Sequence, residues 1–418
     1  MRFFTSGPVF PTQKPLRKSA AERRGSKYRN AVDFKLFPVY IMISATKSTI
    51  HFIRTEFVMK IYNFSAGPAM LPVEVMQLAQ KEFVDYEGSG SGILELSHRG
   101  KFFKPVIDRA EANVRKILNL SDDFAVIFVQ GGASMQFAMV PMNLLNGGTA
   151  DYVDTGVWSN KASKEAKFFG TANIAASSRE DKYAYLPKRE TWKLTPNAAY
   201  LHITTNNTIA GTQYPEIPDV PAGVPLVADM SSDILSRRFD ANKFGLFYAG
   251  AQKNLGPSGL ALVVIRKELA ARTNEEKVPT MLRYSTYIEN GSMFNTPPTF
   301  GIYILALVTD WIIARGGLGA IEEINNAKAA KLYGFLDQSA FFKTPVKGAD
   351  RSRMNVVFRT PSDELDAKFV AEAEKNGLTQ LKGHRLVGGC RASIYNAMPM
   401  EGIDALIDFM KKFELANK

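Results

Sequence analysis

Three short apolar runs between residues 224 and 265 show no alternation of apolar and polar positions. They are Pro225–Ala228, Phe244–Ala251 and Leu260–Ile265, and each is bounded by polar, glycine or proline residues. Continuous apolar runs of this length are typical of strands that are buried on both faces of a sheet. The pattern therefore predicts three interior strands of an α/β domain.

The preceding part of the chain alternates between helical and extended patterns. A helix is predicted over Phe102–Asn119, and strands over Phe124–Val129 and Leu201–Thr205; Asp151–Asn160 reads as a strand that leads into a helix. Alternation of this kind predicts a mainly parallel sheet with helices on both faces. We expect this large domain to span residues 72–315.

The two flanks of this region predict further helices. Pro72 is suited to the first turn of a helix, and the residues after it form an imperfect apolar stripe. The members of that stripe are Val73, Met76, Leu78, Phe83 and Val84. At the other flank, Phe300–Arg315 is strongly apolar and ends at Gly316–Gly319, which predicts a break between domains.

The remaining sequence predicts a smaller α+β domain. Ile321–Leu336 and Asp363–Glu374 have helical patterns, and Met354–Arg359 has the pattern of a strand. We expect residues 316–418 to form this domain together with residues 59–71.

Charge separates the first 58 residues from the rest of the chain. They contain eleven Lys/Arg against three Asp/Glu, which leaves 41 against 38 for residues 59–418. A nucleic-acid or membrane-surface module would place its charge on the folded body, and this body is nearly balanced. We therefore expect no nucleic-acid partner and no membrane partner, although such a module in residues 1–58 is a rival hypothesis.

Residues 1–58 admit more than one interpretation. They are basic, poor in acids and without a periodic pattern, as expected of a disordered extension or a start site assigned too far upstream. An arginine-rich transit peptide is the alternative, which would direct the protein to an organelle. With the first interpretation we expect a cytoplasmic protein.

Cysteine and histidine usage excludes several kinds of site. The single cysteine, Cys390, cannot form an intramolecular disulfide or a cysteine-cluster zinc site, and it fits a reducing compartment. Four widely spaced histidines leave little for a metal centre, so we expect none. No run reaches the ~18 consecutive apolar residues of a membrane span.

Asp229 and Lys253 follow two of the predicted strands, and strand ends are where open α/β sheets bind ligands. A lysine between apolar runs is partly desolvated, which lowers its pKa and makes its amine a nucleophile towards an aldehyde. A lysine Schiff base with an aspartate at the pyridine nitrogen is how proteins hold pyridoxal phosphate. A structural Lys–Asp salt bridge explains the spacing alone equally well.

A second candidate element follows the strand at Phe124–Val129. Gln130-Gly131-Gly132-Ala133-Ser134 leads directly into a helix, so free N–H groups and the positive end of the helix dipole converge there. This turn predicts an anion site, to which the Ser134 hydroxyl adds a donor. A Gly-Gly turn by itself is common and carries little specificity.

Five ordered blocks of sequence resemble one family. They are YNFSAGPAMLP (62–72), LSHRGKFF (96–103), AGAQKNLGPSGLALVVIRKEL (249–269), SMFNTPPTF (292–300) and GHRLVGGCRASIYNAM (383–398). They are similar to the phosphoserine aminotransferases, class-V members of the fold-type-I pyridoxal-phosphate enzymes, and the likeness covers residues 60–418. The resemblance implies a fold-type-I α/β architecture with a mainly parallel seven-stranded-type sheet, and a homodimer with active sites at the subunit interface.

The resemblance also implies roles for residues around the cofactor. Lys253 forms the Schiff base, Asp229 pairs with the ring nitrogen and Trp158 stacks on the ring. The other cofactor-binding residues that it implies are Ala133, Ser134, Thr208 and Gln252 from the same subunit, and Asn295 and Thr296 from the neighbouring one.

Cationic residues are implied as substrate ligands. Arg391 would bind the α-carboxylate, while Arg99, His384 and Arg385 would bind the phosphate, and His98 is a further candidate. Some members of the family have an arginine at the position of Ser134, so its absence here bears on the substrate-phosphate site.

The resemblance implies transamination of 3-phosphohydroxypyruvate with L-glutamate, giving O-phospho-L-serine and 2-oxoglutarate in serine biosynthesis. 4-Phosphohydroxythreonine, from pyridoxine biosynthesis, is a second candidate substrate. The alternative within class V is a different transaminase or a cysteine desulfurase, for which Cys390 would be the sulfur carrier; family members have an apolar residue there, which favours packing.

Overall fold

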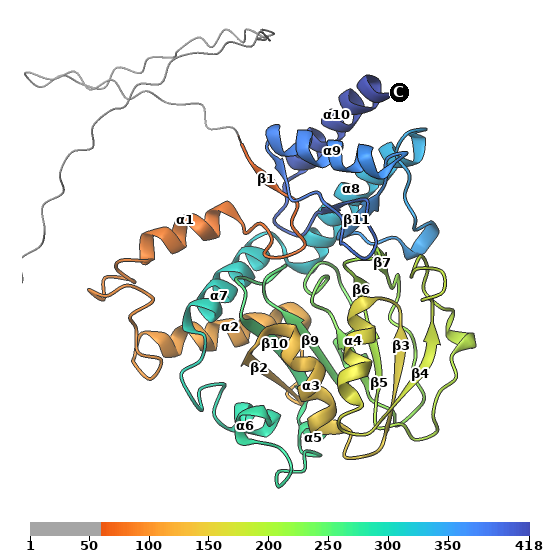
Figure 1. Ribbon diagram of the computed structural model, residues 1–418. Helices are drawn as coiled ribbons and strands as arrows, with labels where there is room; N and C mark the ends of the chain where they lie inside the picture. The colour runs from red at the N-terminus through yellow and green to blue at the C-terminus, as the bar shows by residue number, and fades with distance from the viewer. Residues whose placement is uncertain (1–59) are drawn as a thin grey trace, which may run out of the picture. The chain divides into compact units, whose positions relative to one another are not determined.

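The computed structural model describes residues 60–418, which belong to one compact unit. The interpretations of residues 1–58 lie outside the described residues, and the cytoplasmic location stays a prediction. Figure 1 shows a large sheet flanked by helices, with the C-terminal helices α8, α9 and α10 gathered beyond one end of it.

The secondary structure follows the predicted alternation closely. The strands are β1 (Tyr62–Asn63), β2 (Phe124–Gln130), β3 (Thr149–Asp154), β4 (Thr171–Ser177), β5 (Leu201–Thr204), β6 (Asn206–Asn207), β7 (Thr212–Gln213), β8 (Leu226–Asp229), β9 (Leu246–Gly250), β10 (Leu260–Arg266), β11 (Asn355–Phe358), β12 (Leu378–Thr379) and β13 (Cys390–Ser393). The helices are α1 (Val73–Glu82), α2 (Phe103–Leu118), α3 (Gly132–Leu144), α4 (Val157–Ala166), α5 (Lys267–Ala270), α6 (Tyr284–Glu289), α7 (Thr299–Ala314), α8 (Gly317–Gln338), α9 (Asp363–Lys375) and α10 (Met400–Asn417).

The central sheet has seven strands in the order β2-β10-β9-β8-β5-β3-β4. The pairs β3–β4, β3–β5, β5–β8 and β8–β9 are parallel, whereas β10 runs antiparallel to both β9 and β2. The predicted mainly parallel sheet is therefore confirmed, with one strand reversed.

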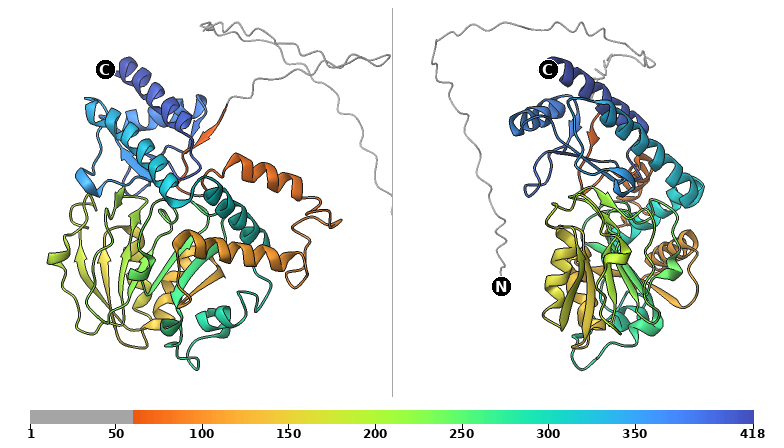
Figure 2. Two further views of the ribbon diagram at one scale, coloured as in Figure 1. Left: turned by 180° about the vertical axis from the view of Figure 1, so that it is seen from behind. Right: turned by 90° about the vertical axis from the view of Figure 1, so that its right-hand side faces the viewer.

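Helices cover both faces of this sheet. Phe124, Val126 and Phe128 of β2 belong to a hydrophobic cluster that includes residues of α2 and α7. Ala125 and Ile127 belong instead to a cluster with residues of α3 and α4. Because successive strand side chains point to opposite faces, the sheet is buried on both sides, as the two views in Figure 2 make visible.

A third hydrophobic cluster lies among the C-terminal elements. It joins side chains of α8, α9, α10, β11 and β13, and it includes Tyr62 and Phe64 from the start of the described chain. β1 pairs in parallel with β12, which ties the N-terminal segment to this cluster. This packing is compatible with domain boundaries at residues 72 and 316, which stay a prediction.

The apolar stripe expected on the first helix does not face the core. Val75 and Ala79 are the buried residues of α1, while Val73 and Met76 are 60% and 50% exposed. Phe83 and Val84, which were expected to continue the stripe, follow the end of α1 and are also exposed. The predicted helix is present and ends at Glu82, and the apolar stripe lies on its exposed side in this chain.

Residues 60–418 contain no single helix with the length and apolarity of a membrane span. Taken together, α7 and α8 have sufficient length and hydropathy, but they are bent by 84° at the break between them. That break follows Ala314, and α8 restarts at Gly317, within the glycine run that predicted it.

Candidate active site

The carboxyl ends of neighbouring parallel strands meet around a cavity of about 460 Å³. Asp229 ends β8 and is paired with Thr204 of β5 and Tyr248 of β9. Lys253 follows the end of β9 by three residues, so both chemical groups reach the same edge of the sheet. The predicted site residues that line the cavity are Ala133, Ser134, Trp158, Thr208, Asp229, Gln252, Lys253, His384 and Arg391.

Lys253 has the properties of a nucleophilic amine. Its side chain is buried, and its Nζ donates a hydrogen bond of 2.8 Å to Oγ1 of Thr208. Burial lowers the pKa of Lys253 to about 8, although the negative charge of Asp229 acts in the opposite direction; the Arg391 cation lowers it further. About a tenth of this amine is therefore unprotonated at pH 7, far more than for an ordinary lysine.

Asp229 is a buried carboxylate whose charge is partly compensated. Burial raises the pKa of Asp229, and hydrogen bonding by Ser231 together with the nearby Lys253 charge act to lower it. The backbone N–H of Ser231 donates to Oδ1 of Asp229 at 2.9 Å. The carboxylate can thus pair with a cationic group that enters the cavity.

The glycine turn after β2 forms the start of α3, as predicted. Gly131 and Gly132 have φ values of +86° and +62°, a region that favours glycine. A Cβ on Gly131 would lie 2.8 Å from Cβ of Met135, so the turn also requires a residue without a side chain. Within residues 60–418 no side chain caps the first turn of α3, and that turn contains no acid, so its N–H groups are suited to an anion.

Aromatic rings form one wall of the cavity. The rings of Trp158 and Phe137 lie 6.4 Å apart between centroids, and the Lys161 amine lies 4.7 Å from the centroid of Trp158. The Trp158 Nε1 atom is buried and has no hydrogen-bond partner among residues 60–418. The wall can stack against a flat ring and exclude water.

Two basic side chains, Arg391 and His384, reach the cavity from the C-terminal elements. Arg391 lies on β13, and burial lowers its pKa; its buried Nε has no hydrogen-bond partner within the described part of the chain. Burial also lowers the pKa of His384, and the charges of Arg391 and Arg385 add to this effect. An unpaired buried guanidinium nitrogen is suited to a ligand carboxylate.

The structure does not bring every predicted residue to this cavity. His98, Arg99, Arg385, Asn295 and Thr296 are absent from its lining. Arg99, Asn295 and Thr296 are exposed, and the backbone of Thr296 accepts a hydrogen bond from Gln130 of the same chain. Their roles stay predictions.

Other lining residues were not singled out in the sequence. Asn206, Ser231 and Ser232 are buried polar residues two or three positions from Thr208 or Asp229 along the chain. Their adjacency to strand ends was the available signal. Ala66, Gly67 and Pro68 also line the cavity, and they come from the first of the resembling blocks, for which no role had been assigned.

Cys390 lies away from the lining. It is fully buried on β13, and burial together with the nearby Asp366 raises the pKa of its thiol. A buried, protonated thiol is a packing residue and a poor sulfur carrier.

Comparison with known proteins gives a consistent assignment. The model of the family described as aminotransferase class-V matches residues 61–406. A phosphoserine aminotransferase of Desulfosudis oleivorans is 55% identical over 361 residues, which cover 86% of this chain and 99% of that protein. One from Bacillus cereus is 50% identical over 360 residues, again covering 86% and 99%.

Solved structures agree with this. A phosphoserine aminotransferase from Bacillus circulans subsp. alkalophilus has a TM-score of 0.84 at 51% identity, over 86% of this chain and 99% of that one. A pyridoxal-phosphate-bound phosphoserine aminotransferase from Trichomonas vaginalis has a TM-score of 0.81 at 40% identity, over 84% and 100%. The chain therefore belongs to the phosphoserine aminotransferase family of class-V aminotransferases and has their fold-type-I architecture.

Proposed function

We propose that this protein transfers the amino group of L-glutamate to 3-phosphohydroxypyruvate, with pyridoxal 5′-phosphate as its cofactor. The products are O-phospho-L-serine and 2-oxoglutarate. The observation that carries the proposal is the buried Lys253 amine, which shares one cavity with Asp229 and with Arg391, whose Nε has no hydrogen-bond partner among residues 60–418.

The residues of the cavity fit this cofactor. Lys253 would bind its aldehyde carbon, Asp229 its ring nitrogen and Thr208 its ring oxygen, while the N–H groups at the start of α3 would receive its phosphate. The unpaired Trp158 Nε1 marks the wall that would cover the ring. When bound, pyridoxal phosphate supplies an electron sink for the electron pair left at the substrate's α-carbon.

Lys253 would also move protons. Once a substrate amine has displaced it, its Nζ is free to take the proton from the α-carbon and to return one during the reverse half-reaction. With a pKa of about 8 it can hold and release that proton near neutral pH. Thr208 accepts from the amine and so directs it into the cavity.

Arg391 and His384 would bind the anionic ends of the substrates. Arg391 forms a bidentate pair with the α-carboxylate, because guanidinium and carboxylate geometries match. His384 lies beside Arg391 and would face the substrate phosphate. Glutamate and the phosphorylated substrate would share this end of the cavity in turn, as the two half-reactions require.

We further propose that the protein is a homodimer. The surface around α1 exposes large apolar side chains, namely Val73, Met76, Phe83, Val84 and Leu94. Clustered exposed apolar side chains are typical of interaction surfaces. A second copy bound there would remove them from water, and it could supply Arg99, Asn295 and Thr296 to the neighbouring cavity, since these residues do not reach their own.

Amino transfer measured by product analysis tests the proposal. The protein, loaded with pyridoxal phosphate, should form O-phosphoserine and 2-oxoglutarate in equal amounts from glutamate and 3-phosphohydroxypyruvate. 4-Phosphohydroxythreonine with 2-oxoglutarate tests the second candidate substrate in the reverse direction. Equal rates with pyruvate as the acceptor, which lacks a phosphate, would contradict the assigned substrate class.

A further inference from the structure

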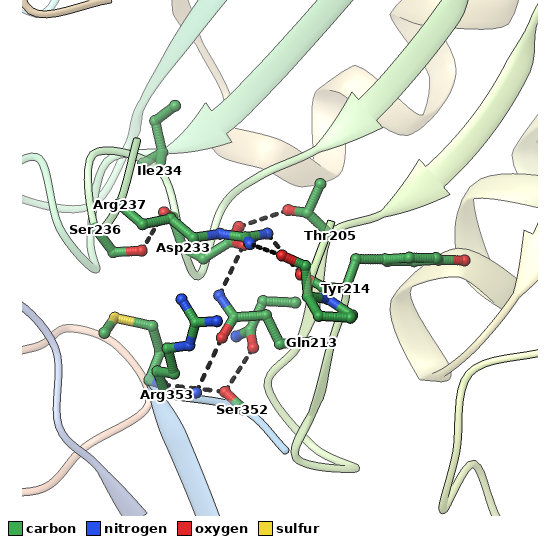
Figure 3. Close-up of polar contacts among 12 residues, drawn as sticks. Thr205, Gln213, Tyr214, Asp233, Ile234, Ser236, Arg237, Ser352 and Arg353 are labelled. Atoms are coloured by element: carbon green, nitrogen blue, oxygen red, sulfur yellow. Dashed lines mark hydrogen bonds and ion pairs between the residues drawn. The ribbon is translucent and has the colours of Figure 1, made fainter. Parts of the chain in front are cut away.

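A second buried carboxylate lies close behind the active site. Asp233 follows Asp229 by four residues in the segment after β8, and Arg237 follows Asp233 by another four. Both Asp233 and Arg237 are buried, at 6% and 7% exposure. Figure 3 shows their side chains at the centre of a polar network that the proposed mechanism does not use.

Asp233 is held on three sides. Thr205 donates a hydrogen bond of 2.5 Å to its Oδ1, and Gln213 Nε2 donates one of 3.1 Å to its Oδ2. Arg237 Nη2 lies 3.9 Å from the same Oδ2 and also donates to the carbonyl of Tyr214. The carboxylate is therefore fixed in position and charge-paired, as a buried anion must be.

Thr205 connects this carboxylate to Asp229. The Thr205 hydroxyl, which donates to Asp233, also lies 3.2 Å from the backbone carbonyl oxygen of Asp229. The backbone N–H of Thr205 donates to the same carbonyl oxygen at 3.0 Å. The position of Asp229 is thus tied to the group that Asp233 holds. A shift of the Asp233 carboxylate would remove the acceptor of the Thr205 hydroxyl, which lies against the end of β8.

Gln213 extends the network to the C-terminal elements. While its Nε2 donates to Asp233, its Oε1 accepts from the N–H of Arg353 at 2.9 Å. Arg353 lies two residues before the start of β11. β11 pairs with β13, the strand that carries Arg391. One amide therefore links the segment of Asp229 to the elements that hold the candidate substrate ligand.

The charge of Asp233 also reaches the reacting groups. Its negative charge acts on Lys253 in the sense that favours the ammonium, and on Asp229 in the sense that disfavours the carboxylate. The other ionisable groups that face this region are Tyr395, which lies near Asp233 and Arg391, Arg391, which acts on Lys253, and Arg353 and Glu322, which act on Arg237. Among the described residues, Asp229 and Asp233 are the two whose negative charges stabilise protonated Lys253.

We propose that Asp233 is a positioning residue of the active site, which fixes Asp229 through Thr205 and supplies a second buried negative charge towards Lys253. The proposal rests on the function proposed for Lys253 and Asp229. A purely structural ion pair between Asp233 and Arg237 is the competing interpretation, and it predicts a loss of stability without any effect on the Lys253 amine.

The test compares two variants. Asp233→Asn removes the charge and nearly keeps the shape, and the double variant Asp233→Asn/Arg237→Gln removes both buried charges, so that no unmatched cation is left if the first variant folds poorly. Asp366→Asn is the control, because Asp366 is equally buried and hydrogen-bonded to Thr360 but does not act on Lys253.

The readout is the pH at which the Lys253 amine becomes reactive, measured by labelling the cofactor-free protein with an amine reagent and quantifying the Lys253 peptide. We expect the midpoint to fall by a few tenths to about one pH unit in both Asp233 variants, and to stay unchanged in the control. With the cofactor loaded, the pH midpoint of its visible absorption should shift in the same direction.

Unshifted midpoints in both Asp233 variants would overturn the proposal, whatever their stability. A protein that does not take up the cofactor would contradict the proposed function instead, and the labelling experiment would still report on Asp233. In steady-state kinetics the variants should lower kcat by more than they change KM for glutamate, since Arg391 is untouched.

Discussion

The Lys253 amine donates a hydrogen bond of 2.8 Å to the hydroxyl of Thr208 at the carboxyl edge of the parallel strands of a seven-stranded sheet. Thr208 lies in the short connection between β6 and β7, whereas Lys253 follows β9, so the bond joins two separate elements. Because both residues are buried, the direction of the amine depends on this single acceptor. That relationship leads to the first prediction.

Removing the Thr208 hydroxyl should lower the pKa of Lys253 below about 8, because a hydrogen bond to the ammonium form favours that form. Thr208→Val should also reduce the free energy of unfolding by about 1 kcal/mol. The pH dependence of Lys253 labelling and denaturant unfolding measure the two effects. Thr208→Ser keeps the hydroxyl and should behave like the unsubstituted protein; an identical shift in both variants would contradict the role of the bond.

Lys253→Arg should abolish amino transfer while the fold is retained. Arginine keeps the positive charge but stays protonated at all accessible pH values, so it can neither attack an aldehyde nor move the α-proton. Turnover should fall by at least roughly 10²–10⁴-fold, the contribution of a positioned proton-transfer group. Product formation measures the loss, and the half-exposed Lys331→Arg is the control. Residual turnover within tenfold of the unsubstituted enzyme would refute the assignment.

Replacing Arg391 by Gln should raise KM for both amino-acid substrates. Loss of a charge-assisted hydrogen bond costs about 1.5–3 kcal/mol, which corresponds to roughly 10–100-fold in affinity. Arg391→Lys should restore little of it, since lysine cannot form the bidentate pair. Initial rates at varied glutamate and O-phosphoserine concentrations measure the change. Arg272→Gln, an exposed arginine outside the cavity, should leave KM unchanged.

The proposed dimer gives a prediction for the surface near α1. Val84 is 78% exposed, and Val84→Glu should weaken self-association because it buries a charge in an apolar interface. At low protein concentration, the variant should sediment as a monomer, and its turnover should be lower than that of the unsubstituted protein. Leu415 is 79% exposed on α10, and Leu415→Glu serves as the matched control. A protein that is monomeric and fully active from the outset would contradict this prediction.

Lys328 gives a pH-dependent contribution to stability. It is fully buried on α8 and donates to the carbonyls of Ile394, Tyr395 and Met398, and burial lowers its pKa from 10.5 to about 7. Between these two pKa values the unfolded state binds more protons at residue 328 than the folded state does. The contribution of Lys328 to the free energy of unfolding therefore rises as pH rises from about 7 to 10.5, and it is lost as pH falls to 7.

Denaturant unfolding across that range measures this effect. The unfolding free energy of the unsubstituted protein should rise with pH relative to that of Lys328→Met between pH 7 and 10.5, because methionine binds no proton in either state. A difference that is constant over this range would show that Lys328 titrates normally in the folded protein.

Much of the large sheet could be predicted because its strands are buried on both faces. The run Leu260–Ile265 became β10 with one additional residue, and Phe244–Ala251 contains β9. The shortness of these runs and the glycine, proline or polar residues at their ends favour a strand over a helix. The reversed direction of β10 could not be predicted, since a run of apolar residues contains no signal for parallel or antiparallel pairing.

The apolar stripe of α1 is left largely without a partner within the described residues of this chain. Val73, Met76 and Val84 satisfy the pattern of a buried stripe, yet they are exposed in the single chain. Sequence periodicity shows that a surface avoids water, and it does not distinguish the core of one chain from the interface between two.

The network around Asp233 lay beyond sequence reasoning for another reason. Asp233, Gln213 and Arg353 are far apart along the chain and meet only through tertiary structure. Isolated polar residues have no periodic signal, and their pairing depends on how loops fold at the strand ends. Lys253 and Asp229 could be found because each follows an apolar run.

The visible absorption of the purified protein with pyridoxal phosphate tests the central claim most directly. The account predicts a yellow species that requires Lys253 and that is bleached by O-phosphoserine and by glutamate, while alanine and cysteine leave it unchanged. A yellow protein that O-phosphoserine does not bleach would contradict the assigned substrate. A protein that remains colourless with added pyridoxal phosphate would contradict the cofactor and the reaction together.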